Sequence, residues 1–341
     1  MNKLILVTGG TGYIGSHTCV ELLNEGFDVV IADNLSNSDI TVLDGIEKIT
    51  GKRPFFEKTD LADSKETIAL FEKYPKIEAI IHFAAYKAVG ESVNFPLKYY
   101  YNNLNSLINL LNSMEQKNVS NIVFSSSCTV YGEPDILPVT ESATIKPATS
   151  PYGNTKQICE EMLKDFTSVS PSLKCIALRY FNPVGAHSSA LIGELPLGIP
   201  NNLLPFITQT AIGLRDELKV YGDDYNTPDG TAIRDYIDVV DLSKAHVIAI
   251  KRLIESKNKK NLEIFNLGTG NGVSVLEVIH TFEKTTGVKL NYKIVGRREG
   301  DVEKVFADTR FANAELGWKA EKKLEETILS SWNWEKNIRK K

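Results

Sequence analysis

Residues 4–15 read LILVTGGTGYIG, an apolar run that leads directly into a glycine-rich loop. The loop has the spacing GxGxxG at Gly10, Gly12 and Gly15. Asp33 follows Gly15 by 18 residues and lies at the end of the next apolar run. A glycine loop between a strand and a helix, with an acidic residue at the end of the second strand, is typical of a dinucleotide-binding βαβ unit.

Outward from this loop, short apolar runs rich in β-branched residues alternate with longer stretches of helical periodicity. We expect strands at residues 4–8, 28–33, 54–59, 79–83, 121–126 and 173–179. We expect helices at residues 14–25, 64–73, 99–118 and 152–169. Continuous apolar strands are buried on both faces, which requires a parallel sheet covered by helices on either side. The expected fold class is therefore α/β, with a doubly wound parallel sheet of the Rossmann type.

The character of the sequence changes near residue 180, where prolines and glycines divide the chain into loops and short elements. We therefore expect a dinucleotide-binding Rossmann domain at residues 1–180 and a smaller mixed α/β substrate domain at residues 181–341. A segment near residues 236–256 has the periodicity of an amphipathic helix and is expected to return to the first domain.

The 341 residues carry a formal net charge of -4 and are 42% hydrophobic, as in an ordinary globular protein. This acidic balance argues against a nucleic-acid partner, and no apolar run is long enough to span a membrane. The four cysteines and five histidines show no metal-ligand spacing, so no metal site is expected. A cleavable leader would have to destroy the glycine loop, and we therefore expect a cytoplasmic protein.

The glycine loop favours one of the two nicotinamide cofactors. Glycines let the backbone approach a pyrophosphate, and the N-terminus of the following helix favours its negative charge. Asp33 is able to accept hydrogen bonds from both hydroxyls of a ribose and would repel a 2′-phosphate, so NAD is favoured over NADP. Asp60 and Leu61, at the next strand end, are placed to cover an adenine edge, although a solvated turn is the alternative there.

A tyrosine and a lysine form a second candidate site. Tyr152 and Lys156 make a YxxxK at the start of an expected helix, where residues four apart share one face. A neighbouring cation favours the tyrosinate, so we expect a lowered pKa that lets Tyr152 take a proton from an alcohol. One serine of the run 125–127, at a strand end, is the expected partner of the substrate oxygen, although strand-end capping is the alternative.

This combination resembles the short-chain dehydrogenase/reductase superfamily. Eight segments occur in the order found in its UDP-glucose 4-epimerase family: TGGTGYIGSHT, HFAAYKAVGES, SSSCTVYGEP, SPYGNTK, LRYFNPVGAH, GIPNNLLPFI, DGTAIRDYIDVVDL and RREGD. The resemblance extends from about residue 4 to residue 334, and it includes motifs of the second domain as well as the cofactor domain.

The resemblance implies a catalytic role for three residues. Tyr152 would be the general base for the sugar C4 hydroxyl, Ser127 would bridge the sugar oxygen and the phenol, and Lys156 would hold the nicotinamide ribose. The implied reaction interconverts UDP-glucose and UDP-galactose through a 4-keto sugar, with NAD that stays bound. The implied cofactor contacts are Gly9, Gly12, Tyr13, Ile14, Gly15, Asp33, Asn34, Asp60, Leu61, Phe83, Ala84, Lys87, Asn102, Tyr152, Lys156 and Tyr180.

The resemblance also implies a UDP-sugar site, with cations for the two phosphates. The implied substrate contacts are Lys87, Ser127, Tyr152, Asn182, Asn202, Leu203, Tyr221, Arg234, Arg298, Asp301 and Val305. Val305 stands where family members restricted to UDP-glucose and UDP-galactose have a tyrosine. We therefore expect room for a 2-acetamido group and a substrate range that includes N-acetylated UDP-sugars. The alternative is that Val305 simply packs against a neighbour.

Three other functions stay open at this point. Nucleotide-sugar dehydratases of the same superfamily carry Thr-Asp-Glu after the fifth strand, where this chain has Ser127, Cys128 and Thr129. The absence of that acid argues for an epimerase, which could act on another nucleotide sugar. A non-catalytic NAD-binding regulator would need neither the tyrosine nor the lysine of the YxxxK.

The family usually pairs as a homodimer through a helix bundle. The expected helices at residues 99–118 and 152–169 carry apolar stripes, which include Leu107, Leu110 and Leu111 in the first helix. Because such stripes serve equally well as intramolecular core, the expected homodimer rests on the resemblance.

Overall fold

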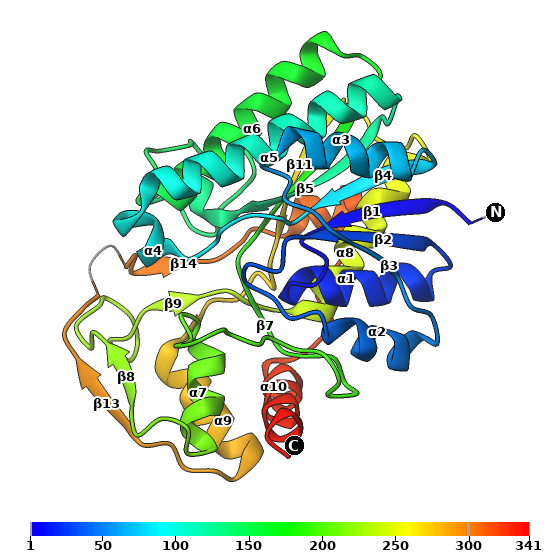
Figure 1. The fold of residues 1–341 in the computed structure, drawn as a ribbon. Coiled ribbons are helices and arrows are strands. Elements are labelled where there is room, and N and C mark those ends of the chain that lie inside the picture. Colours follow the sequence, from blue (N-terminus) through cyan, green and yellow to red (C-terminus); the bar gives the residue numbers. More distant parts are fainter. Residues whose placement is uncertain (1, 299–300, 341) are drawn as a thin grey trace.

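The largest element of the computed structural model, which describes residues 2–298 and 301–340, is a seven-stranded sheet (Figure 1). The strands lie in the order β11-β6-β5-β4-β1-β2-β3, and every neighbouring pair is parallel. Their bounds are β1 Leu4–Thr8, β2 Asp28–Asp33, β3 Phe55–Lys58, β4 Ile77–His82, β5 Asn121–Ser127, β6 Lys174–Tyr180 and β11 Leu262–Leu267. The expected doubly wound parallel sheet is confirmed.

The strand order creates a crevice at one edge of the sheet. From β1 the chain proceeds through β2 and β3 in one direction and then through β4, β5 and β6 in the other. In such sheets the ligand binds at this switch point, outside the carboxyl ends of the strands. The glycine loop follows β1, and the serine run ends β5, so both lie at this edge.

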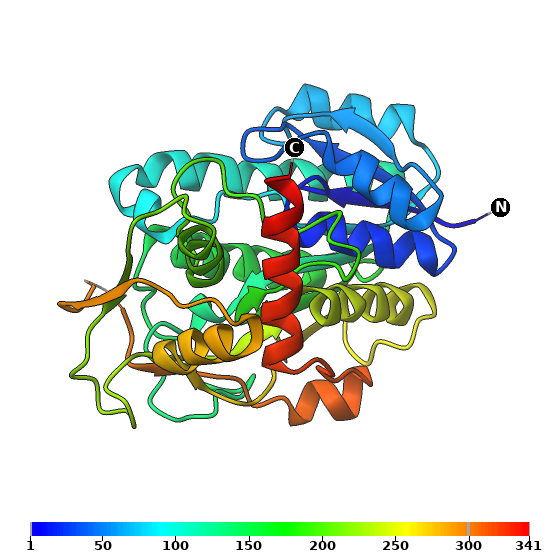
Figure 2. The same cartoon turned by 90° about the horizontal axis from the view of Figure 1, so that it is seen from below.

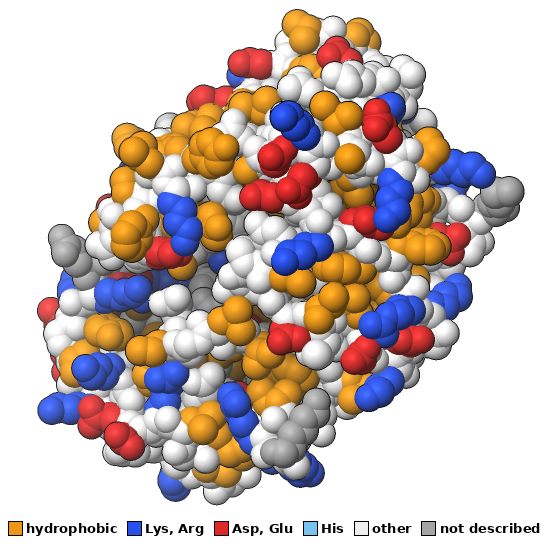
Figure 3. All heavy atoms as spheres, viewed as in Figure 1, with side chains coloured by type: hydrophobic (Ala, Val, Ile, Leu, Met, Phe, Trp, Pro, Cys, Tyr) orange, Lys and Arg blue, Asp and Glu red, His pale blue; other side chains and the backbone are white. Residues whose placement is uncertain are grey.

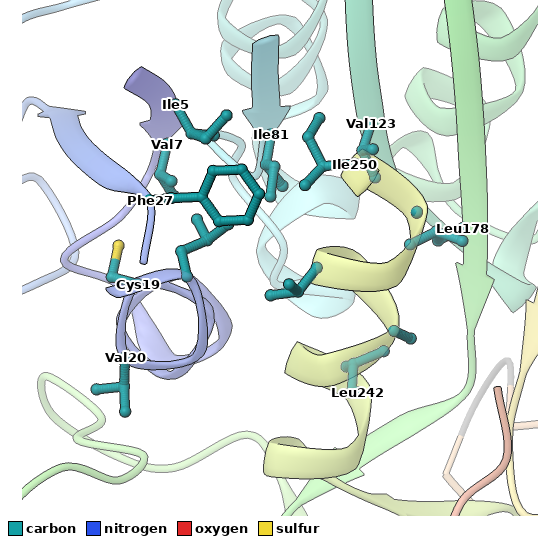
Figure 4. Packing of buried hydrophobic residues seen from close by; sticks show 14 of the residues in the cluster. Ile5, Val7, Cys19, Val20, Phe27, Ile81, Val123, Leu178, Leu242 and Ile250 are labelled. Carbon is teal, nitrogen blue, oxygen red and sulfur yellow. The ribbon is translucent and has the colours of Figure 1, made fainter. Parts of the chain in front are cut away.

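Helices cover both faces of the sheet, and each face has its own hydrophobic core. Figure 4 shows part of the first core, in which Val20 and Leu242 extend from α1 and α8 while Ile81 and Leu178 extend from the sheet. The helices on this face are α1 Tyr13–Asn24, α2 Val42–Thr50 and α8 Val239–Ile254. The helices on the other face are α3 Ser64–Lys73, α5 Pro96–Lys117 and α6 Pro151–Val169. Within the described residues, no helix combines the length and the apolar character that a membrane span requires.

The remaining elements form a smaller lobe with a separate core. Its strands are β7 Asn182–Val184, β8 Leu218–Tyr221, β9 Ile233–Arg234, β10 Tyr236–Asp238, β12 Val273–Ser274, β13 Tyr292–Val295 and β14 Lys304–Val305. Its helices are α7 Leu203–Ala211, α9 Val275–Thr286 and α10 Leu324–Ile338. Short helices lie elsewhere in the chain, namely α4 Val89–Asn94, η1 Cys128–Tyr131 and η2 Ala312–Leu316. Figure 2 shows α10 crossing the molecule beside both lobes.

The chain passes between the two lobes more than once. Helix α8 lies in the expected returning segment and packs on the large sheet, and β11 adds a seventh strand to the edge of that sheet. This strand was not expected, because it lies in the part of the sequence that reads as the second domain. The division at residue 180 stays a prediction.

The start of α6 sets the position of the candidate catalytic residues. The Ser150 hydroxyl accepts a hydrogen bond from the Gly153 N–H at 3.1 Å, and Pro151 occupies the first helical position. Both choices are favourable, because proline has no N–H to leave unpaired and serine satisfies one of the free donors. The helix therefore begins one residue before the expected start, and Tyr152 lies in its first turn.

Candidate active site

The glycine loop between β1 and α1 has a backbone that side chains would block. Gly9 has a φ of +67°, and a Cβ built on Gly15 would lie 2.3 Å from the Gly9 carbonyl oxygen. Helix α1 begins after Gly12 without a side-chain cap, so its first N–H groups have no side-chain acceptor. Tyr13 and Ile14, the first residues of the helix, line a cavity. These features make a cradle that presents backbone donors to an anion.

Asp33 ends β2 beside this loop, as expected. Its carboxylate accepts hydrogen bonds from the N–H groups of Thr11, at 3.3 Å, and Leu35, at 2.9 Å. The Ser38 hydroxyl donates to the same carboxylate at 3.2 Å. These bonds fix the carboxylate at the mouth of the glycine loop, where it also lines the cavity.

The three serines at the end of β5 have different partners. The Ser125 hydroxyl bonds to the phenol of Tyr180, and the Ser126 hydroxyl donates to the buried carboxylate of Glu160. Ser127 accepts a hydrogen bond from the Thr129 N–H at 3.2 Å. Ser125 and Ser127 line the cavity, whereas Ser126 is fully buried and is engaged with Glu160. Ser127 is therefore accessible from the cavity, whereas Ser126 stabilises the protein interior through its bond to Glu160.

Tyr152 and Lys156 lie on one face of α6, next to the end of β5. The ammonium of Lys156 is buried and donates to the Ser125 carbonyl oxygen at 2.6 Å. It also lies 4.8 Å from the centre of the Phe124 ring. Both residues line the cavity with Ser127, so the expected tyrosine, lysine and serine come together.

The expectation of a lowered pKa for Tyr152 is wrong for the protein chain by itself. Burial raises the pKa of this phenol to about 12, although hydrogen bonding with the Ser127 side chain opposes the rise. Burial also lowers the pKa of Lys156 to about 8, which leaves the ammonium protonated at neutral pH. The spacing of four residues places both groups together, but the lysine proton is donated to a backbone carbonyl and desolvation disfavours the phenolate.

One cavity of about 1750 Å³ runs along the carboxyl ends of the strands into the smaller lobe. Figure 3 shows the surface hollowed between the two lobes, with Lys and Arg side chains at the rim. The site residues expected from the sequence that line it are Gly9, Gly12, Tyr13, Ile14, Gly15, Asp33, Asn34, Asp60, Leu61, Phe83, Ala84, Lys87, Asn102, Ser127, Tyr152, Lys156, Tyr180, Asn182, Asn202, Arg298 and Asp301.

The other four expected residues lie outside the described lining. Leu203 packs against the core of the smaller lobe, and Tyr221 is 42% exposed at the end of β8. Val305 is buried in a hydrophobic cluster with Val130 and other apolar side chains. This placement agrees with the alternative reading of Val305 as a packing residue. Arg234, the fourth, is engaged in an ion pair.

Arg234 and Asp301 bind each other in this structure. The Arg234 Nη2 lies 2.9 Å from the Asp301 Oδ1, and the arginine side chain is largely shielded from solvent. Arg298 extends across the cleft, where its Nη2 would lie 3.6 Å from a Cβ built on Gly90 of α4. Glu299 and Gly300, which belong to the RREGD segment, lie outside the described residues.

Several residues that line the cavity are not among the site residues expected from the sequence. Glu194 lies in a proline-rich stretch that gives no helix or strand signal, and its side chain is only 12% exposed. Trp334 reaches the cavity from α10 and Arg339 from the residue just after it, far along the chain from most of the other lining residues. No sequence pattern pointed to these residues, because contacts between segments far apart in the chain bring them to the cavity.

Comparisons with known proteins agree with this arrangement. A sequence model of the family described as GDP-mannose 4,6 dehydratase matches residues 6–330. A UDP-glucose 4-epimerase of Bacillus subtilis (strain 168) is 50% identical over 331 residues, which cover 97% of this chain and 96% of that protein. The bifunctional protein GAL10 of Pachysolen tannophilus is 52% identical over 334 residues, 97% of this chain, and the chain spans about half (48%) of that longer relative.

A solved structure extends the similarity to three dimensions. It is a UDP-glucose 4-epimerase from Stenotrophomonas maltophila with bound NAD and formylated UDP-arabinopyranose. The two chains superpose with a TM-score of 0.95 at 48% identity, over 100% of this chain and 99% of that chain.

Proposed function

The chain belongs to the UDP-glucose 4-epimerase family, and we propose that it interconverts UDP-glucose and UDP-galactose with bound NAD. One observation carries the proposal most directly. Tyr152, Ser127 and Lys156 lie at the same cavity as the glycine loop, so an alcohol can meet a base and a dinucleotide together.

The cavity fits NAD at its dinucleotide end. The uncapped N-terminus of α1 offers backbone donors to a pyrophosphate, and the missing side chain of Gly15 lets this end of the helix pack against the Gly9 and Gly10 backbone. Asp33 would accept from the adenosine ribose, and Lys156 would hold the nicotinamide ribose. When bound, NAD would accept the hydride that leaves the sugar C4 carbon and would return it in the second half of the reaction.

The chain's own residues would move the proton and hold the sugar. Tyr152 would accept the C4 hydroxyl proton, and Ser127 would bond to the same oxygen and fix its distance to the phenol. Burial raises the pKa of Tyr152, and the hydrogen bond with the Ser127 side chain opposes that rise and so favours the phenolate. In the reverse half, Tyr152 would return the proton to the 4-keto oxygen.

The smaller lobe would anchor the UDP group, while the sugar is free to turn. Asn182, Asn202 and Arg298 line the cavity away from the glycine loop, and arginine forks suit phosphate oxygens. Arg234 would contact a phosphate either beside its ion pair with Asp301 or in place of it. Binding free energy at the nucleotide, remote from C4, lets the 4-keto sugar present either face for reduction.

The test uses purified chain with no added NAD. We expect it to convert UDP-galactose to UDP-glucose, quantified by anion-exchange chromatography, and to release NAD when it is denatured. UDP-N-acetylgalactosamine in a parallel reaction tests the broader range expected at Val305. If UDP-galactose is not converted even after NAD is supplied, the proposed substrate is wrong.

The dehydratase alternative lacks its acid. The residue after Ser127 is Cys128, and burial raises the pKa of its thiol to about 12. Such a thiol stays protonated and is a poor substitute for a carboxyl group as an acid in water elimination. The epimerase reaction, which needs only the tyrosine, serine and lysine, suits these residues better.

We also propose that the chain forms a homodimer. Leu107, Leu110 and Leu111 are buried in the core of their own chain, so they are unavailable to a partner. Leu97 and Tyr101, however, are 80% and 65% exposed on α5 and share one face of the helix. Light scattering after gel filtration should give twice the mass of one chain. A measured mass equal to that of one chain would contradict the dimer.

A cytoplasmic location is proposed as well. Cys19, Cys159 and Cys175 are buried free thiols, and Cys128 is also free, as is usual in a reducing compartment. Subcellular fractionation of the source cells tests this, and recovery outside the cytoplasmic fraction would contradict it.

A further inference from the structure

Glu194 connects two residues that the proposed function assigns to ligands. It lies between β7 and α7, and its Oε1 accepts a hydrogen bond from the Asn202 Nδ2 at 2.6 Å. The same oxygen lies 3.5 Å from the Lys87 Nζ, which follows β4 in the larger lobe. One carboxylate therefore links a cation of the larger lobe to an amide of the smaller lobe, within the wall of the cavity.

The backbone that carries Glu194 is itself held by α10. The Trp334 Nε1 donates to the Glu194 carbonyl oxygen at 2.9 Å. Gly193 packs so closely on the indole that a Cβ there would lie 2.5 Å from it. Ile192, just before, is fully buried in the core of the larger lobe. The carboxylate thus extends from a fixed segment, and its position is not that of a freely moving surface side chain.

The Asn202 side chain bonds to Glu194 and does not cap helix α7. It is the N-cap residue of α7, where an asparagine side chain normally accepts a hydrogen bond from the helix. Here the Asn202 side chain makes no cap hydrogen bond, and its amide donates to Glu194 instead. The N-terminus of α7 is left without that cap, at the end of the cavity proposed for the UDP group.

We propose that Glu194 is a positioning residue, which holds Lys87 and Asn202 in the geometry that binds the UDP-sugar. The proposal rests on the function proposed above. Lysine has a long, flexible stem, so an ion pair that fixes it in advance reduces the entropy lost when a ligand binds. Lys87 also lies 5.9 Å from the centre of the Tyr13 ring, which confines it from the other side.

The test compares Glu194→Gln with wild type, using UDP as the binding probe in isothermal titration calorimetry. Glutamine keeps an oxygen for Asn202 but removes the charge that holds Lys87. We expect the Kd for UDP and the KM for UDP-galactose to rise about three- to tenfold, with kcat changed less than about twofold. Glu72→Gln is the matched control, because Glu72 is exposed on α3, outside the described lining of the cavity.

A double-mutant cycle shows whether Glu194 acts through Lys87. In a Lys87→Met background, Glu194→Gln should change the Kd for UDP less than about twofold, whereas a general disturbance of the fold would add its full effect. Glu194→Asp, which restores the charge on a shorter stem, should recover part of the lost affinity. Equal thermal unfolding midpoints for wild type and variants exclude loss of folding.

Three results would overturn the proposal: unchanged UDP affinity in Glu194→Gln, full additivity with Lys87→Met, or tighter binding of UDP. The last result would make Glu194 a competitor of the phosphates rather than their support. Failure of the proposed function is a separate outcome, because it shows as wild-type protein that does not epimerise UDP-galactose, while UDP binding is measured without turnover.

Discussion

The substitution Gly15→Ala adds a single methyl group to the glycine loop and so tests whether the shape of this loop is needed to bind NAD. The added Cβ would lie 2.3 Å from the Gly9 carbonyl oxygen and 2.8 Å from the Gly10 Cα. Both contacts are to backbone, so no flexible side chain can turn aside to admit the methyl group. The glycine loop and the start of α1 must therefore move apart.

The size of this movement sets the expected loss of NAD. To reach an ordinary contact of 3.4 Å, the Cβ and the carbonyl oxygen must separate by about 1.1 Å. A shift of that size would break or bend one or two of the backbone hydrogen bonds that the loop and the start of α1 would make to the pyrophosphate. Hydrogen bonds to a charged group contribute about 1.5–3 kcal/mol each, so we expect NAD affinity to fall at least about tenfold.

The protein is purified by gel filtration and then denatured, and the NAD that it releases is quantified. The Kd for NAD is measured separately on protein from which NAD has been removed. Gly296→Ala is the matched control, because Gly296 has no heavy atom within 4 Å of its added Cβ and no positive φ. The control should retain NAD like wild type. Wild-type NAD occupancy in Gly15→Ala, with a Kd for NAD within about twofold of wild type, would show that close packing at Gly15 is not needed for NAD binding.

Other predictions address catalysis, stability and pH. Tyr152→Phe should lower kcat at least about 100-fold while NAD stays bound, and near wild-type turnover would remove Tyr152 as the base. Arg179→Met leaves the Glu160 carboxylate without its buried ion pair, so urea denaturation should show a loss of about 3–5 kcal/mol in unfolding free energy. A loss under about 1 kcal/mol would contradict this. Burial lowers the pKa of His246 to about 4. Below pH 6.5 this histidine therefore binds a proton in the unfolded chain but stays neutral in the folded protein, and the stability falls as the pH falls. His246→Gln should reduce that slope by up to about 1.4 kcal/mol per pH unit between pH 6.5 and 4, and an unchanged slope would contradict the assignment.

The sequence predicts the larger lobe well because its signals are local. Apolar runs mark five of the seven strands, the shorter run FFEK marks β3, and the glycine spacing marks the turn into α1. Ser150 and Pro151 mark the start of α6, and this places Tyr152 and Lys156 on one face. Each inference needs only neighbouring residues and the known period of a helix or a strand.

The parts that the sequence does not predict depend on packing between distant segments. β11 joins the sheet about 80 residues after β6, beyond a segment of the smaller lobe and α8. Glu194 reaches Lys87 from a backbone that contacts with α10 and with the larger core hold in place. The wrong expectation for the pKa of Tyr152 has the same origin. A spacing of four residues brings a lysine near, but it does not state how much solvent the phenol loses or which oxygen accepts the lysine proton.

The fate of the hydrogen at C4 distinguishes an epimerase from a dehydratase. Purified protein is incubated with UDP-galactose that carries deuterium at C4, and the product is analysed by NMR and mass spectrometry. We expect UDP-glucose with the deuterium still at C4, because the hydride that leaves C4 would return to the same carbon. Deuterium lost to solvent would contradict this, and so would deuterium at C6 of a 4-keto-6-deoxy sugar, the outcome expected of a dehydratase.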